Sequence, residues 1–252
     1  MSWLRDWKRR RILARHAIDD ALWDTVVRKL PFLAPLGEAE LRRLREFAIV
    51  FLAEKQFSAE RGLVLTDAMR LSIAVQAVLP VLALGLDWYS GWTGIVVYPG
   101  DFRVRREEVD EHGVVHQWDD ELAGESWPGG PVVLSWEALN DEPHMNVVIH
   151  EFAHKLDMLN GEADGVPPLH AEMDRKRWAE AWKPAWEGFC DAVDREKETW
   201  LDPYAAEHEA EFFAVMSEAF FIDPLEARRR YPEVYAQLAL FYRQDPAARM
   251  SA

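Results

Sequence analysis

The chain has 252 residues, 49% hydrophobic and 29% charged, a composition that excludes a disordered chain and allows one large domain or two small ones. Its 44 acidic residues outnumber its 29 basic residues, and the net charge of −15 argues against nucleic-acid binding over the whole surface. A single cysteine, Cys190, rules out an intramolecular disulfide and a cysteine-rich zinc module, and it indicates a reducing, cytoplasmic compartment.

The first 55 residues are predicted to be helical. Apolar residues recur at helix spacing over residues 18–30, and a second helix is expected from Glu38. The basic run at residues 8–11 is followed by no apolar stretch or cleavage site, so no secretory signal peptide is expected. A solvated helix end is the favoured interpretation of this run, and contact with a membrane surface or with nucleic acid is the alternative.

The middle of the chain combines a helix with a few strands. A helix is expected over residues 68–84, with Thr66 and Asp67 as its cap. It includes most of the longest uncharged stretch, residues 71–86, which is predicted to be buried because it is short for a membrane span and contains a proline. Strands are expected at residues 93–98 and 130–136, and the acidic segment 101–126 between them is predicted to be an exposed hairpin or loop. The second strand is expected in the core of a sheet, or alternatively at an edge that binds an extended substrate.

Helices are predicted over the rest of the chain. Their ranges are about 146–159, 170–198, 205–222 and 224–243. Helices, a few strands and then further helices predict an α+β fold that is mainly helical with a small β-sheet, rather than a doubly wound sheet.

One motif on the first of these helices carries recognisable chemistry. Residues 147–157 read VVIHEFAHKLD, so His150 and His154 lie one turn apart on the same helix face, where both imidazoles can bind one metal ion. Glu151 stands beside them, within reach of a metal-bound water. A pair of ordinary surface histidines is the alternative. We therefore expect a zinc site with a glutamate base.

Zinc in such a site needs a third protein ligand, and a second helix supplies candidates. The segment 204–218 offers five side chains: Glu207, His208, Glu209, Glu211 and Glu218. Glu207, Glu211 and Glu218 share one helix face, whereas His208 faces away from Glu211. Glu211 begins an apolar stretch in which a buried carboxylate requires a partner, while a solvated acidic face fits Glu207 and Glu209 better.

Other polar residues near the motif have competing interpretations. Asp157 is either an acid that orients a ligand imidazole or an ordinary acid on the helix surface, and Glu218 is a second candidate for the orienting role. His144 and His170 are expected to be solvated loop residues. Cys190 is expected to be a small buried residue rather than a nucleophile.

The two blocks HEFAHKLDMLNG and DPYAAEHEAEFFAVMSEAFF closely resemble the Mlc titration factor A family of zinc metallopeptidases. The second block also resembles the catalytic domain of anthrax lethal factor, another gluzincin. The resemblance implies a zincin-like catalytic domain over residues 61–252, with residues 1–60 as a helical segment that packs on it, or one continuous domain. It implies His150, His154 and Glu211 as Zn²⁺ ligands.

The resemblance also assigns catalytic roles and partners. It implies Glu151 as the general base and Tyr204, which matches the active-site tyrosine of the family, as a donor to the oxyanion. It implies a cytoplasmic peptidase, an aminopeptidase acting on small peptide substrates, and binding to a glucose-responsive transcriptional repressor of sugar uptake genes. We expect no direct nucleic-acid contact and no membrane span. The alternative function is a regulatory protein that sequesters the repressor without catalysis.

Overall fold

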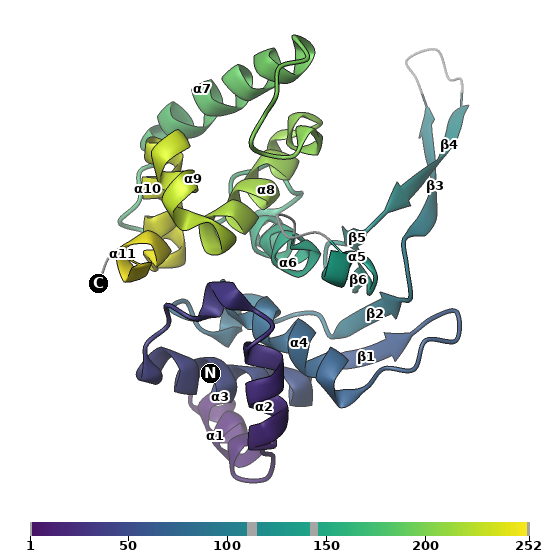
Figure 1. Ribbon diagram of the computed structural model, residues 1–252, viewed down its shortest axis with the longest axis vertical. Helices are drawn as coiled ribbons and strands as arrows, with labels where there is room; N and C mark the ends of the chain where they lie inside the picture. The colour runs from purple at the N-terminus through teal and green to yellow at the C-terminus, as the bar shows by residue number, and fades with distance from the viewer. Residues whose placement is uncertain (1, 110–114, 142–145, 251–252) are drawn as a thin grey trace.

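The computed structural model describes residues 2–109, 115–141 and 146–250 (Figure 1). The N-terminal helices are α1 (Ser2–Leu13), α2 (Asp20–Val27), α3 (Glu38–Glu54) and α4 (Asp67–Val78). The hydroxyl of Thr66 caps α4 by accepting the backbone N–H of Met69 at 3.2 Å. The helix ends at Val78 and not near residue 84, because Pro80 lacks an N–H and does not fit a continuing helix. Residues 71–82 are almost entirely buried, as predicted.

A small mixed sheet follows in the order β1 (Gln56–Ala59), β2 (Gly94–Tyr98), β6 (Val132–Ser135) and β5 (Gly124–Ser126). β1, β2 and β6 are parallel, and β5 runs antiparallel to β6. β6 pairs on both sides, which confirms it as a core strand and shows that the edge-strand alternative is wrong. The edge strand next to β6 is β5, whose three residues are too few to show an alternating pattern in the sequence.

A hairpin of β3 (Phe102–Val109) and β4 (Val115–Leu122) leads into the sheet edge. It projects away from the body of the molecule in Figure 1. The two strands confirm the hairpin prediction, and the predicted turn at residues 110–114 lies outside the described residues. Because only Ala123 separates β4 from β5, the base of the hairpin positions the edge strand.

The C-terminal part consists of helices α5 (Ala138–Asp141), α6 (Val147–Asp157), α7 (Arg175–Asp194), α8 (Glu209–Ile222), α9 (Pro224–Arg230), α10 (Pro232–Tyr242) and α11 (Pro246–Met250). The predicted helix over residues 224–243 is divided into α9 and α10, because Pro232 cannot continue a helix and instead begins a new one. The fold is thus mainly helical α+β with a small sheet, as predicted.

Helix α6 lies between the N-terminal and the C-terminal helices. It packs against α4, β5 and α8, and its buried apolar side chains belong to one cluster with apolar residues from both ends of the chain (Figure 1). Within the described ranges, no helix has both the length and the apolar character required to cross a bilayer. The division of the chain near residue 60 stays a prediction.

Candidate metal centre

Helix α6 presents both predicted histidines in the interior of the molecule. It begins after Asn146, whose side-chain oxygen accepts the backbone N–H of Ile149 at 2.9 Å and so caps the first turn. Nearly every residue of the helix is buried, because it packs against helices on one side and the sheet on the other. The imidazoles of His150 and His154 therefore lie below the surface of the molecule.

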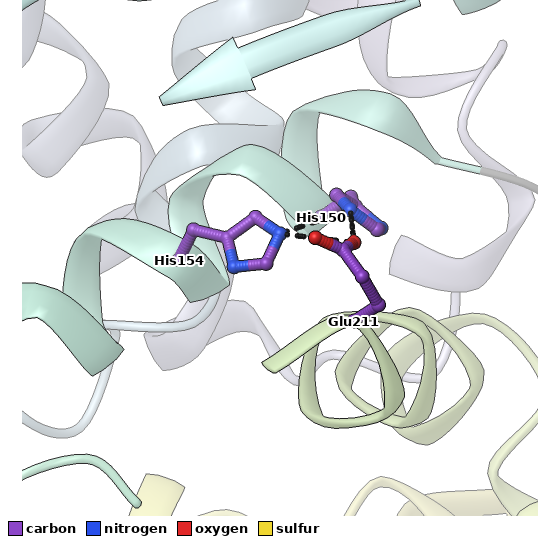
Figure 2. Close-up of side chains that lie close together, drawn as sticks. All are labelled: His150, His154 and Glu211. Atoms are coloured by element: carbon purple, nitrogen blue, oxygen red, sulfur yellow. Dashed lines mark hydrogen bonds and ion pairs between the residues drawn. The ribbon is translucent and has the colours of Figure 1, made fainter. Parts of the chain in front are cut away.

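Glu211 reaches the two histidines from the first turn of α8 (Figure 2). Nε2 of His150 lies 3.1 Å from Nε2 of His154 and 3.1 Å from Oε2 of Glu211, and that oxygen lies 3.3 Å from Nε2 of His154. The three side chains thus point three potential ligand atoms at one position. Two neighbours do not join them: His208 caps α8 with Nδ1, and Glu209 is exposed.

The charges of this cluster are strongly coupled. Burial acts to lower the pKa of His150, but hydrogen bonds to Glu211 and Glu218 outweigh it and hold the pKa well above 6.5. Burial acts to raise the pKa of Glu211, but hydrogen bonds to the two histidines outweigh it and hold the pKa well below its usual range. The buried, ionised carboxylate of Glu211 therefore stabilises a positive charge in the cluster. A proton on His150 can supply this charge, and a bound metal cation would replace that proton.

Glu218 orients His150 from the opposite side of the ring. Nδ1–H of His150 donates to Oε1 of Glu218 at 2.7 Å, which leaves the Nε2 lone pair directed at the cluster. Oε2 of Glu218 accepts the backbone N–H of Asn146 at 2.5 Å, and Nδ2 of Asn146 donates to Oε1 of Gln76 at 2.6 Å. One hydrogen-bonded chain therefore connects α4, α6 and α8 behind His150. The sequence analysis named Glu218 as a candidate but missed Asn146, although an asparagine before an apolar helix is a capping signal.

Glu151 lies under the edge strand. A Cβ at Gly124 would stand 2.5 Å from Oε1 of Glu151 and 2.7 Å from Cγ2 of Val147, so only glycine allows β5 to approach this closely. The Ser126 hydroxyl donates to the backbone oxygen of Glu151 at 2.9 Å and ties β5 to α6. Burial raises the pKa of Glu151, and its Oε2 has no hydrogen-bond partner among the described residues. Sequence analysis missed Gly124, because the close approach depends on how β5 crosses α6.

A cleft of about 260 Å³ adjoins the cluster and reaches it at His150. Tyr204 lies on the short 3₁₀-helix η4 (Pro203–Ala206), is 39% exposed, and has its ring centre 6.3 Å from that of His150. The cleft is lined by side chains of β4, β5, α6, η4 and α8 and by the residues that join them: Leu122, Ala123, Gly124, Val147, His150, Glu151, Asp202, Tyr204, Val215 and Glu218. The predicted base and the predicted tyrosine therefore line the same opening.

The remaining predictions have mixed outcomes. Asp157 is fully buried, so it is not a surface acid, and its Oδ2 accepts the Gly165 backbone N–H at 2.8 Å rather than an imidazole N–H. His170 is partly buried and not solvated, because Nε2 is held by the Phe241 carbonyl at 2.8 Å. His144 lies outside the described residues. Cys190 is partly buried, and its Sγ lies 3.8 Å from the Ala206 carbonyl oxygen.

The cluster consists of two imidazoles and a carboxylate, and a further buried glutamate, Glu151, lies beside it. Metallopeptidases use sites of this kind. A protein-family model described as glucose-regulated metallo-peptidase M90 matches residues 4–243. The chain belongs to this family, which implies a metal ion. It is similar to the protein named Mlc titration factor A of Yersinia pestis (strain Pestoides F) and of Yersinia pseudotuberculosis (serotype O:1b, strain IP 31758). Each is 40% identical over 227 residues, which cover 88% of this chain and 84% of the relative.

Proposed function

We propose that the protein is a zinc-dependent peptidase in which His150, His154 and Glu211 hold the ion. The observation that carries the proposal is the triangle of ligand atoms, 3.1–3.3 Å on each side. Three atoms bound to one tetrahedral zinc ion by bonds of about 2.0–2.2 Å lie roughly 3.3–3.5 Å apart. Three protein ligands leave one position open, which is the arrangement of a catalytic rather than a structural zinc site.

In the proposed hydrolysis, the metal ion and the surrounding side chains have different roles. When bound, zinc polarises a carbonyl group and lowers the pKa of a water molecule to about 7. Glu151, which lines the cleft, accepts the proton of the attacking water and passes it to the departing amine. The Tyr204 hydroxyl donates a hydrogen bond to the oxyanion, a contribution of about 10²–10³ in kcat in comparable sites.

The sheet edge supports a peptide as the substrate. Within the described residues no strand pairs with the outer edge of β5, so an extended chain can add to the sheet there. Gly124 on this edge lines the same cleft as Glu151. A peptide that pairs with β5 therefore passes over the general base, which brings its carbonyl group to the cluster.

The finer proposal is an aminopeptidase acting on small peptides in the cytoplasm. The resemblance of the two motif blocks supports it, and so does Asp202, an acidic residue that lines the cleft, because a carboxylate is suited to a free α-ammonium group. We expect hydrolysis of an aminoacyl anilide and none of its N-acetylated form. Equal hydrolysis of both would contradict the aminopeptidase assignment and leave the peptidase assignment in place.

Metal analysis with a peptide-hydrolysis assay tests the proposal. We expect bound zinc in the wild type, loss of zinc and activity in Glu211→Ala, and neither loss in Glu209→Ala, a matched change of an exposed acid on the same helix. Glu151→Gln should keep its zinc and lose about 10²–10⁴ in rate. Full zinc occupancy in Glu211→Ala would show that the third ligand is wrong, and full activity in Glu151→Gln would overturn the mechanism.

Binding to a transcriptional repressor is the second candidate function. The observation that favours it is the name Mlc titration factor A carried by relatives that are 40% identical. A pull-down with an Mlc-type repressor tests it: we expect complex formation by both the wild type and Glu151→Gln, because titration needs binding and not hydrolysis. Absence of a complex with the wild type would remove this function.

A further inference from the structure

Helix α1 presents two different faces. It lies along α3 at the bottom of Figure 1. On one side, Arg5 and Arg9 form ion pairs with Asp87 at 3.1 and 2.6 Å, and Lys8 pairs with Glu54 at 3.1 Å. These contacts fix how the helix is turned against the body of the molecule, and so determine which residues face outward.

The outward face is apolar at its centre and basic at its flanks. At 100° per residue, Trp3, Leu4, Arg10 and Arg11 all lie within about 60° of Trp7 around the helix. Trp3, Leu4 and Trp7 are 67%, 57% and 46% exposed. They are three neighbouring large apolar side chains on one helix, whereas single exposed apolar residues elsewhere need no explanation.

The charges on this face are available to a partner. The Arg11 guanidinium stacks 4.6 Å from the centre of the Trp7 ring, and within the described residues no acid pairs with Arg10 or Arg11. The one acid of the helix, Asp6, lies about 100° away from Trp7. A basic face on a chain with a net charge of −15 is complementary to an anionic partner.

We propose that the outward face of α1 binds the surface of an anionic lipid bilayer. Tryptophan and arginine are suited to the headgroup region, because each combines an apolar body with a polar end. The face is the convex side of a single helix, which a flat and deformable lipid surface accommodates. Phosphates of a nucleic acid would match the arginines but would leave the two indole rings and Leu4 without apolar partners.

Vesicle sedimentation with the 252-residue chain tests this proposal. We expect binding to vesicles that contain phosphatidylglycerol and little binding to phosphatidylcholine alone. Trp3→Ser/Trp7→Ser should weaken binding about tenfold or more. Arg10→Gln/Arg11→Gln should weaken binding to the anionic vesicles about 10–30-fold.

Matched controls change the same chemistry at other places. Arg175→Gln/Arg177→Gln removes two exposed positive charges from α7, and Leu225→Ala/Leu240→Ala removes two exposed apolar side chains. Both controls should bind vesicles like the wild type. Failure of the wild type to bind phosphatidylglycerol vesicles would overturn the proposal, as would binding that neither α1 variant weakens. Two other results, each obtained without vesicle binding, would also overturn the proposal, because they would assign the face to another partner. One is binding to duplex DNA that depends on α1, and the other is a dimer that is lost in Trp3→Ser/Trp7→Ser.

Discussion

The two ends of helix α6 differ in how completely their polar side chains are paired. At the N-terminal end, Asn146 and His150 have hydrogen-bond partners on α4 and α8. Toward the C-terminal end, Nδ1 of His154 and Oδ1 of Asp157 are buried and have no hydrogen-bond partner among the described residues. Oε2 of Glu151, between the two ends, has none either.

Helix α6 is thus divided into an end whose polar groups are paired and a part whose buried polar atoms are not. Buried polar atoms are nearly always paired, so an unpaired one lowers stability and requires an explanation. The paired end fixes the orientation of His150 through Asn146 and Glu218. At the other end, buried polar atoms without partners lower the stability of the protein, and two of these atoms belong to Glu151 and His154, to which we assign roles in the proposed reaction.

The largest effect is expected at Asp157, where burial raises the pKa to about 7. The folded protein keeps this proton between about pH 4 and pH 7, where the unfolded chain releases it, so the wild type loses stability as the pH rises through this range. Asp157→Asn has no charge to bury, and its amide oxygen still accepts the Gly165 N–H. We expect the metal-free variant to be more stable than the wild type by up to about 4 kcal/mol at pH 8 and nearly equal at pH 4.

Chemical denaturation across this pH range measures the difference. Glu162→Gln, in the exposed loop that follows α6, is the control and should show no pH-dependent gain. A constant difference between Asp157→Asn and the wild type at every pH would contradict the raised pKa.

The next effect is expected at Gly124, where the edge strand touches Glu151. In Gly124→Ala the new methyl group would stand 2.5 Å from Oε1 of Glu151, so the carboxylate must move. A displacement of about 1 Å of a reacting group costs roughly 10² in rate. We therefore expect kcat to fall by about this factor while the metal content stays at the wild-type level.

A glycine in open space provides the comparison for Gly124→Ala. A Cβ at Gly188 on α7 would meet no atom within 4 Å, so Gly188→Ala should keep full activity and gain slightly in stability. If Gly124→Ala hydrolysed peptides at the wild-type rate, the contact would have no part in placing Glu151.

The sequence predicts the cluster of His150, His154 and Glu211 far better than it predicts the residues around the cluster. The spacing of His150 and His154 follows from helix periodicity, and Glu211 follows from helix phase and from the apolar stretch it begins. Neither rule places Gly124, because its role depends on how a three-residue strand crosses a helix. The same limit applies to Asp157, whose burial results from the loop that returns to it at Gly165.

At the paired end, Glu218→Gln is expected to weaken metal binding. The amide oxygen can still accept the Nδ1–H of His150, but the amide nitrogen cannot accept the Asn146 N–H, and the change removes the negative charge that makes the imidazole a stronger ligand. We expect zinc affinity to fall about 10–100-fold with little change in kcat at saturating zinc. Competition with a chelator measures the affinity, and Glu209→Gln, an exposed acid on the same helix, should equal the wild type. Unchanged affinity in Glu218→Gln would show that Glu218 only packs against the histidine.

The smallest effect is expected at Asn146, which both caps α6 and connects it to α4. Asn146→Ala loses the hydrogen bond to the Ile149 N–H, at a cost of about 1–2 kcal/mol, and leaves the buried Oε1 of Gln76 without its donor. Asn146→Ser can still cap the helix but cannot reach Gln76, so its stability should lie between those of the wild type and Asn146→Ala. Denaturant midpoints measure this order, with Asn160→Ala as an exposed control that should change less. If Ser and Ala gave equal losses, the cap would contribute nothing, and the contact with α4 would be the interaction that holds this end of the helix.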